Sequence, residues 1–167
     1  MTDAGALLHV LTRDALDGLG VAYEVMSCDP ALADTAAFVE AYGVPLERSA
    51  NSIIVASKGA EPFHVACVVL ATTALDVNRV VRREMGVRKA SFASAEPVRA
   101  LTGMEIGGVT PFGLPDTVPV LVDSRVMEAD WIVLGGGNRS SKLKVAPGAL
   151  LRMPSVRVVE GLAIERQ

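Results

Sequence analysis

One segment, residues 103–115, constrains the fold more than any other part of the chain, because its thirteen residues include four glycines and two prolines. Glycine lets the backbone adopt a positive φ or approach a neighbour closely, and proline stiffens the segment around it. A loop of this composition holds backbone N–H groups in fixed directions, as an oxygen-binding site requires. Such loops also serve as plain connections, so the composition leaves two alternatives open, a binding loop and a long turn.

The length of 167 residues predicts a single domain over residues 1–167, with a core that needs no disulfide or metal. Hydrophobic residues make up 50% and charged residues 21%, and every apolar run is too short to span a membrane. The first residues lack the basic flank of a signal peptide, so we expect a cytoplasmic protein with no membrane partner. Cys28 and Cys67 are too far apart for a zinc motif, and we expect two reduced thiols, no metal and no cofactor.

The hydrophobic pattern predicts interspersed helices and strands. Helical spacing and capping residues indicate helices over 7–19, 35–42, 76–85 and 94–102, with a helical turn over 147–151. β-rich runs indicate strands over 21–26, 52–56, 64–71, 87–93, 118–123, 131–134 and 143–146, with 156–159 as an added edge strand. Without strict alternation of strand and helix, the expected class is α+β or mixed α/β, with helices packed around a mixed sheet.

Several common catalytic sites are excluded by missing residues. An activated nucleophile needs a neighbouring base, but the only histidines are His9 and His64, and there is no G-x-S-x-G motif. The cluster at 135–139 lacks the third glycine of a dinucleotide fingerprint and precedes a strand, and no Walker loop is present.

Two charged features remain as candidates. Asp123 ends an apolar strand, where a carboxylate either orients a water or an ammonium group or caps a turn. The net charge of −3 argues against nucleic-acid binding over the whole surface, but one local cluster is basic. This basic cluster either contacts phosphates or is a solvated helix face; it comprises Arg79, Arg82, Arg83, Arg88 and Lys89.

Four segments in register, 49–55, 101–111, 120–123 and 132–137, resemble the YbaK / prolyl-tRNA synthetase insertion-domain family of aminoacyl-tRNA deacylases. Gly107 to Pro111 matches the family's GxxxP motif. The resemblance implies that family's fold, a mixed and mostly antiparallel sheet of about seven strands surrounded by four or five helices. It also implies an activity, trans-editing hydrolysis of the ester that joins a wrong, small amino acid to tRNA, with proline tRNA as the expected carrier.

The resemblance also implies roles for individual residues. The expected catalytic set is Gly107 and Gly108, whose N–H groups would stabilise an oxyanion, with Asn51 as a positioning group and Asp123 as an orienting carboxylate. Water would be activated by the terminal hydroxyl of the tRNA. The expected substrate-binding residues are Ser52, Val109, Thr110, Pro111, Gly135, Gly136 and Gly137. The partner would be aminoacyl-tRNA, with or without its synthetase, and the basic cluster would contact its acceptor stem.

One position departs from the family pattern. Asn51 stands where the family usually has a lysine in a K-[ST]-[LI] motif, which removes a charge-assisted hydrogen bond worth about 1.5–3 kcal/mol. The substitution therefore favours an alternative, a non-catalytic module that binds an aminoacyl-tRNA end or a small amino-acid-like ligand. Hydrolysis of an ester unrelated to tRNA is a third reading.

Overall fold

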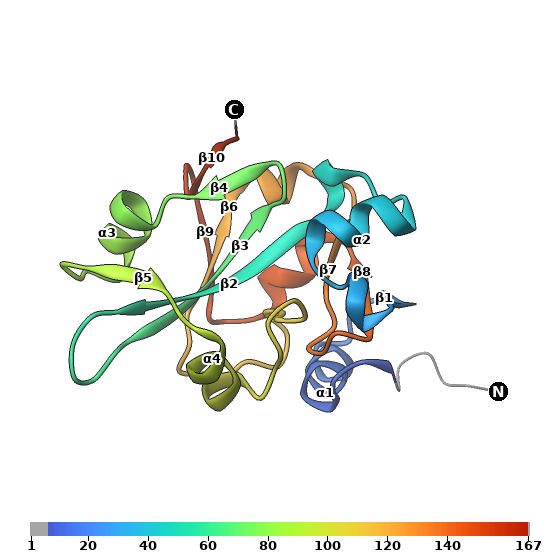
Figure 1. The fold of residues 1–167 in the computed structure, drawn as a ribbon, viewed down its shortest axis with the longest axis horizontal. Helices are drawn as coiled ribbons and strands as arrows, with labels where there is room; N and C mark the ends of the chain where they lie inside the picture. Colours follow the sequence, from blue (N-terminus) through green and yellow to red (C-terminus); the bar gives the residue numbers. More distant parts are fainter. Residues whose placement is uncertain (1–6, 167) are drawn as a thin grey trace.

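The computed structural model describes residues 7–166, and its framework is a five-stranded sheet in the order β5-β2-β3-β6-β9 (Figure 1). The hairpin predicted over residues 52–71 lies inside this sheet, where β2 and β3 pair antiparallel from Ala50↔Leu70 to Ala56↔His64. β6 and β9 continue the sheet in parallel. The strands are β2 (Ala50–Ser57), β3 (His64–Leu70), β5 (Ala90–Phe92), β6 (Val120–Asp123) and β9 (Val156–Val159).

Both faces of β3 are buried, because its alternate residues enter two different cores. Ala66 and Val68 face a core that includes Leu16 and Phe112. Val65, Cys67 and Val69 face a second core built with residues 77–81 and 159–163. An uninterrupted apolar run such as this is expected for a strand covered on both sides.

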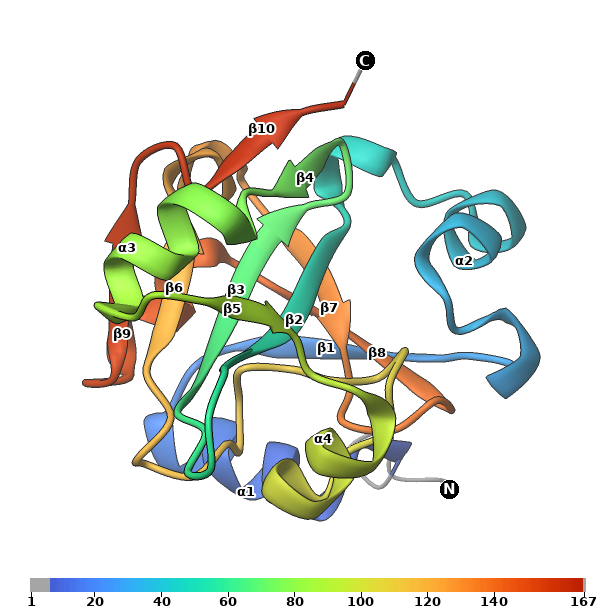
Figure 2. The same cartoon turned by 60° about the vertical axis from the view of Figure 1, so that its left-hand side comes forward.

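A second, three-stranded sheet has the order β1-β8-β7 and is antiparallel throughout. Its strands are β1 (Tyr23–Ser27), β7 (Ile132–Gly135) and β8 (Ser141–Val145). A parallel bridge between Ser49 and Val133 joins it to the start of β2. Figure 2 shows β1 and β8 crossing behind β2 and β3, and the bridge from Ser49 places the junction with β7 just before the first residue of β2.

Four α-helices occur within residues 7–166: α1 (Val10–Leu19), α2 (Thr35–Tyr42), α3 (Arg82–Met85) and α4 (Ala95–Thr102). The predicted helix ends at Gly20 and Gly43 are confirmed, because both glycines adopt the left-handed conformation just past the last helical residue. α1 and α4 lie side by side at one end of the molecule, and α2 stands apart from them (Figures 1 and 2).

Shorter elements differ from the prediction. The helix expected from Asp76 begins as a π-helical segment, η4 (Val77–Val81), before α3, and the strand expected over 87–93 is only β5. Two short strands that the sequence pattern did not predict, β4 (Thr73–Leu75) and β10 (Ala163–Glu165), pair with each other. The remaining elements are 3₁₀ helices: η2 (Pro30–Leu32), η3 (Leu46–Arg48), η5 (Ser124–Glu128) and η6 (Pro147–Arg152).

The fold class is confirmed as a mixed α and β structure with mostly antiparallel strand pairs, although the ten strands within residues 7–166 form three sheets instead of one sheet of about seven. Both cysteines are free and buried, and burial raises the pKa of Cys67 to about 12. Over residues 7–166, no helix has the length and apolar character to cross a bilayer.

Candidate active site

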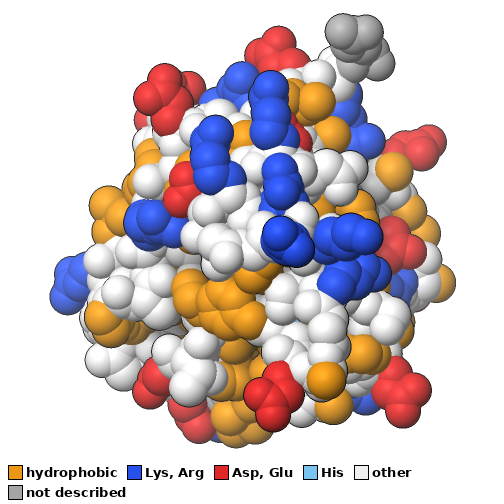
Figure 3. Space-filling model, turned by 90° about the vertical axis from the view of Figure 1, so that its left-hand side faces the viewer, with side chains coloured by type: hydrophobic (Ala, Val, Ile, Leu, Met, Phe, Trp, Pro, Cys, Tyr) orange, Lys and Arg blue, Asp and Glu red, His pale blue; other side chains and the backbone are white. Residues whose placement is uncertain are grey.

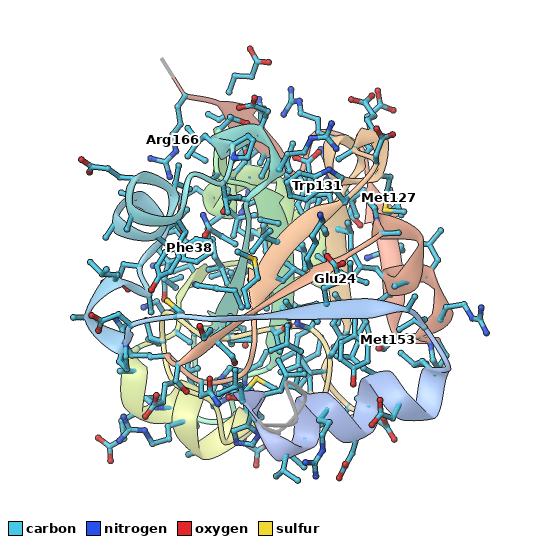
Figure 4. All side chains as sticks on the ribbon, turned by 90° about the vertical axis from the view of Figure 1, so that its right-hand side faces the viewer. Glu24, Phe38, Met127, Trp131, Met153 and Arg166 are labelled. Atoms are coloured by element: carbon cyan, nitrogen blue, oxygen red, sulfur yellow. The ribbon has the colours of Figure 1, made fainter. Side chains whose placement is uncertain are left out.

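A cavity of about 250 Å³ lies where the two sheets meet. Its walls come from the start of α2, the start of β2, the glycine loop of residues 103–115, and strands β7 and β8. Figure 4 shows this side of the molecule, with Phe38 near α2 and Trp131 near the start of β7. The lining residues are Asp34, Thr35, Phe38, Ser49, Ala50, Asn51, Ser52, Ile53, Gly107, Val109, Val133, Leu134, Gly135 and Lys142.

The glycine loop can approach β7 only because side chains are absent at the contacts. A Cβ on Gly108 would lie 2.1 Å from the backbone oxygen of Asn138, and one on Gly135 would lie 2.5 Å from the oxygen of Gly108. The N–H of Gly137 donates to the same Gly108 oxygen at 2.6 Å. The two glycine clusters of the sequence are thus packed against each other, backbone to backbone.

Gly107 presents the backbone of this loop to the cavity. It adopts φ +94°, and its carbonyl oxygen accepts a hydrogen bond from Lys142 Nζ at 3.1 Å. Within residues 7–166 the N–H of Gly107 has no hydrogen-bond acceptor, whereas the N–H of Gly108 donates to the backbone oxygen of Glu105 at 2.9 Å. Of the two N–H groups expected to form an oxyanion site, only that of Gly107 is therefore free to bind a substrate oxygen.

Arg139 ties the loop to the α2 side of the cavity. Its guanidinium donates to the backbone oxygens of Pro30 and Ile106 at 3.0 and 2.9 Å, and to Asp34 Oδ1 at 3.0 Å. A Cβ on Gly107 would lie 2.1 Å from Arg139 Nη1, so glycine is required there for both its φ and the space it leaves. The sequence pattern placed Arg139 at the end of the 135–139 glycine cluster, expected to close over the substrate, but assigned it no role of its own.

Lys142 is a second residue that the sequence pattern did not single out. It lies on β8 opposite Gly135 and is only 6% exposed. Its Nζ donates to the oxygens of Ala33 and Gly107 and lies 5.0 Å from the centroid of the Phe38 ring. Burial lowers the pKa of Lys142 below its ordinary value, Cys28 and Asp34 oppose that shift, and Arg139 adds to it.

Asn51 and Ser52 line the cavity from the opposite wall. Asn51 Oδ1 accepts a hydrogen bond from the hydroxyl of Thr35, which ties the start of β2 to the start of α2. Ser52 Oγ is buried and has no hydrogen-bond partner among the described residues. Both side chains are neutral, so this wall offers polarity without charge.

Asp123 does not line the cavity, and the structure favours the turn-capping alternative. Its carboxylate accepts hydrogen bonds from the backbone N–H groups of Arg125 and Ala163, at 2.9 and 2.8 Å. Only 1% of the surface of Asp123 is exposed. Both oxygens are occupied in joining β6 to η5 and β10, which leaves none to orient a substrate.

The other expected site residues divide into two groups. Val109 and Gly135 line the cavity together with Gly107, Asn51 and Ser52. Five residues lie behind the lining: Gly108, Gly136, Gly137, Thr110 and Pro111. Of these, Gly136 has no room for a Cβ, which would fall 2.0 Å from Ser141 Oγ, so it supports the packing of the β7–β8 turn.

The basic cluster lies on η4, on α3 and on the segment that leads to β5. Figure 1 places α3 and α2 at opposite ends of the molecule, and Figure 3 shows Lys and Arg side chains gathered on the face at the α3 end. Arg79 pairs with Asp76 at 3.2 Å, and Arg82 donates to the oxygens of Asn78 and Arg88. The cluster is exposed, but it does not adjoin the cavity.

No group of three or more histidine, cysteine, aspartate or glutamate side chains within residues 7–166 is placed to hold a metal ion. The lining of the cavity includes one carboxylate, Asp34, one cation, Lys142, and no histidine or cysteine. Its chemistry therefore depends on backbone N–H groups, neutral polar side chains and one buried ammonium.

Comparison with known proteins agrees with this architecture. YwhH of Bacillus subtilis, an uncharacterized protein, is 33% identical over 111 residues, covering 66% of this chain and 68% of YwhH. EbsC of Enterococcus faecalis, a candidate Cys-tRNA(Pro)/Cys-tRNA(Cys) deacylase, is 22% identical over 121 residues, covering 72% of both chains.

Two crystal structures share the fold. One, of a candidate trans-editing enzyme for prolyl-tRNA synthetase, has a TM-score of 0.78 at 21% identity and covers 99% of both chains. The other, of hypothetical protein APE2540, has a TM-score of 0.80 at 22% identity and covers 92% of this chain and 99% of its own. The family model described as the aminoacyl-tRNA editing domain matches residues 29–153, a range that includes every lining residue of the cavity. The chain belongs to the aminoacyl-tRNA editing domain family, as the resemblance of its glycine motifs to the YbaK proteins predicts.

Proposed function

We propose that this protein hydrolyses the ester bond of mischarged aminoacyl-tRNA in trans, with a small amino acid as the aminoacyl group and proline tRNA as the first candidate carrier. Family membership supports the reaction class. The cavity supports the size limit, because its volume of about 250 Å³ falls below the roughly 300–1,000 Å³ of pockets for drug-sized ligands. Discrimination among small side chains would rest on fit, at about 1–3 kcal/mol per methylene.

The observation that carries the proposal is that Gly107 lines the cavity and that its N–H makes no hydrogen bond within residues 7–166. In ester hydrolysis, water adds to the carbonyl carbon and gives up a proton, and the C=O electron pair moves onto the carbonyl oxygen, creating an oxyanion. The intermediate then collapses, the bond to the ribose oxygen breaks, and that oxygen takes up a proton. A fixed N–H directed at the oxyanion lowers this barrier, and removing one such donor typically costs about 10²–10³ in rate.

The remaining roles follow from position. Asn51 and Ser52 hold the ribose end from the β2 wall, and Asp34, the one carboxylate of the lining, attracts the ammonium of the aminoacyl group. No lining side chain among residues 7–166 is left free to act as a general base, since the pocket holds no histidine, its carboxylate, Asp34, is paired with Arg139, and Lys142 donates to two carbonyls. The terminal hydroxyl of the tRNA itself orients the attacking water.

The basic cluster contacts phosphates only if the acceptor stem runs along the protein from α2 toward α3. The test is the salt dependence of tRNA binding by a variant in which three members are alanine: Arg83, Arg88 and Lys89, whose side chains make no hydrogen bond or ion pair within residues 7–166. Each lost phosphate contact should reduce the slope of log K against log salt concentration by about one. An unchanged slope would remove the cluster from the interface.

The proposed activity is tested by a deacylation assay against a panel of mischarged tRNAs, including alanyl and cysteinyl esters of proline tRNA. The native protein should hydrolyse at least one small aminoacyl ester well above the uncatalysed rate. Gly107→Ala should abolish that rate, and Gly148→Ala should retain it, because a Cβ on Gly148 meets no atom within 4 Å.

One observation favours the alternative, a non-catalytic module that binds an aminoacyl-tRNA end or a small amino-acid-like ligand. Asn51 offers no charge, and its Oδ1 is already bonded to Thr35. Such a module would bind charged tRNA without shortening the lifetime of its ester, so the same assay, run beside a binding measurement, separates the two functions.

A further inference from the structure

Lys142 is a buried cation without a counter-ion. Among residues 7–166, no carboxylate oxygen lies within 4.0 Å of its Nζ, and the carboxylate of Asp34 is paired with Arg139. The ammonium donates to the oxygen of Ala33 at 2.6 Å and to that of Gly107 at 3.1 Å. A lysine ammonium has three N–H donors, so these two contacts leave one for a ligand.

The position of Lys142 is unusual for a lysine on a strand. β8 alternates between buried apolar residues and the two lysines 142 and 144, and this pattern normally directs lysines to solvent. Lys144 follows the pattern, with 38% of its side chain exposed, whereas the glycine loop and the start of α2 cover Lys142. Keeping an unpaired ammonium buried is unfavourable unless dipoles or a ligand compensate for the lost hydration.

The cavity gains its positive charge from this one residue. Asn51 and Ser52 on the facing wall are neutral, and among residues 7–166 Lys142 is the only cation in the lining. A fixed cation with a spare donor, beside the free N–H of Gly107, is the arrangement that stabilises a negatively charged oxygen in a site with little water.

We infer that Lys142 binds an anionic oxygen of the substrate and so supplies, from β8, the charge that Asn51 does not provide from β2. The inference rests on the proposed function. An aminoacyl-tRNA end offers such an oxygen in two places, the oxyanion of the tetrahedral intermediate and the phosphate of the terminal nucleotide.

The first test compares Lys142→Gln, which keeps neutral N–H donors but removes the charge, with the matched control Lys144→Gln on the same strand. Lys142→Gln should lower kcat/KM for a mischarged tRNA by about 10- to 100-fold, and the control should stay within twofold. A fall in kcat alone identifies the oxyanion as the partner, whereas a rise in KM alone identifies the phosphate. Activity of Lys142→Gln within twofold of the native protein would overturn the inference.

A second variant distinguishes the loss of charge from a folding defect, and melting curves show whether each variant is folded. Lys142→Arg keeps the charge and should retain more activity than Lys142→Gln. If the arginine variant folds and is the less active of the two, charge is not what the site needs and the inference fails.

The last measurement needs no turnover and separates the inference from the proposed function. The trinucleotide CCA, which carries the phosphate of the terminal nucleotide but no aminoacyl ester, is titrated into the native protein and into Lys142→Gln by calorimetry. If the native protein hydrolyses no mischarged tRNA, the proposed function fails, and CCA binding then decides the inference. Binding about tenfold weaker in Lys142→Gln supports it, and equal or undetectable binding by both proteins overturns it.

Discussion

Replacing Gly108 by alanine tests whether the glycine loop and the β7–β8 turn are as close as the structure has them. The added Cβ would lie 2.1 Å from the Asn138 oxygen and 2.4 Å from its carbonyl carbon, whereas real Cβ contacts stay beyond 3.0 Å. Both obstacles are backbone atoms, so the loop must move by about 1 Å. That shift would break the hydrogen bond from Gly137 N–H to the Gly108 oxygen.

Overpacking of this kind costs about 1–3 kcal/mol, and the lost hydrogen bond adds about 0.5–1.5 kcal/mol. We expect Gly108→Ala to lower the free energy of unfolding by about 2–4 kcal/mol in urea titrations. Deacylation should fall by about 10²-fold, because a displacement of about 1 Å misplaces the neighbouring Gly107 N–H. The control, Gly148→Ala, has open space around its Cβ and should stay within about 0.5 kcal/mol of the native protein. A stable, fully active Gly108→Ala would refute the close packing of the two segments.

Three further predictions concern the cavity. Arg139→Ala should partly restore folding stability to Gly107→Ala, by about 1 kcal/mol in a double-mutant cycle. The Cβ added at position 107 would lie 2.1 Å from Arg139 Nη1, and removing the arginine relieves that clash. The restoration is partial because the strain of φ +94° at an alanine remains. In the native background, Asn51→Lys should lower both stability and deacylation, because it places a second cation in the cavity that holds Lys142. In the Lys142→Gln background, the same substitution should raise deacylation. Values of kcat/KM measure deacylation, and urea titrations measure stability. The third prediction concerns pH. Burial depresses the pKa of Lys142 in the folded protein, so between its folded and unfolded pKa values the unfolded chain binds more protons. The free energy of unfolding, measured relative to that of Lys142→Met, should therefore rise with pH across that window.

The pH measurement must allow for the other groups around Lys142. Cys28 and Asp34 approach from the α2 side, and Arg139 approaches from the β7–β8 turn. Burial raises the pKa of the Cys28 thiol, which makes stability fall as pH rises through the thiol's unfolded value. Taking the difference between native protein and Lys142→Met at each pH largely cancels that contribution. A difference that stays flat or falls up to pH 10 would contradict the depressed pKa.

Much of the fold was predictable because its signals are local. Gly20 and Gly43 end their helices as the sequence pattern predicts, and the apolar runs around residues 57–63 form the central hairpin. β4 and β10 were not predictable in this way. Each has three residues, and they pair across about ninety positions of the chain, so no periodicity within either one identifies them.

The candidate site was only partly predictable, for a similar reason. The glycine motifs located the loop, but composition could not separate Gly107, which faces the cavity, from Gly108, whose absent side chain permits packing. Alternation along β8 predicts an exposed Lys142, and only the loop and helix that cover this strand reverse that expectation. For Asp123 the sequence left two alternatives open, orienting a water or ammonium group and capping a turn. The structure favours the second because the N–H groups of Arg125 and Ala163, which lie on separate elements, donate to its carboxylate.

The contacts that close the cavity join positions far apart in the chain. The bonds from Arg139 to Asp34 and from Lys142 to Ala33 span 105 and 109 residues, respectively. During synthesis the glycine loop and α2 leave the ribosome before β8, so the cavity cannot form on the nascent chain until β8 has also emerged. The same separation makes the site sensitive to partial opening: release of β8 would remove the positive charge of Lys142 from the cavity while the five-stranded sheet stays intact.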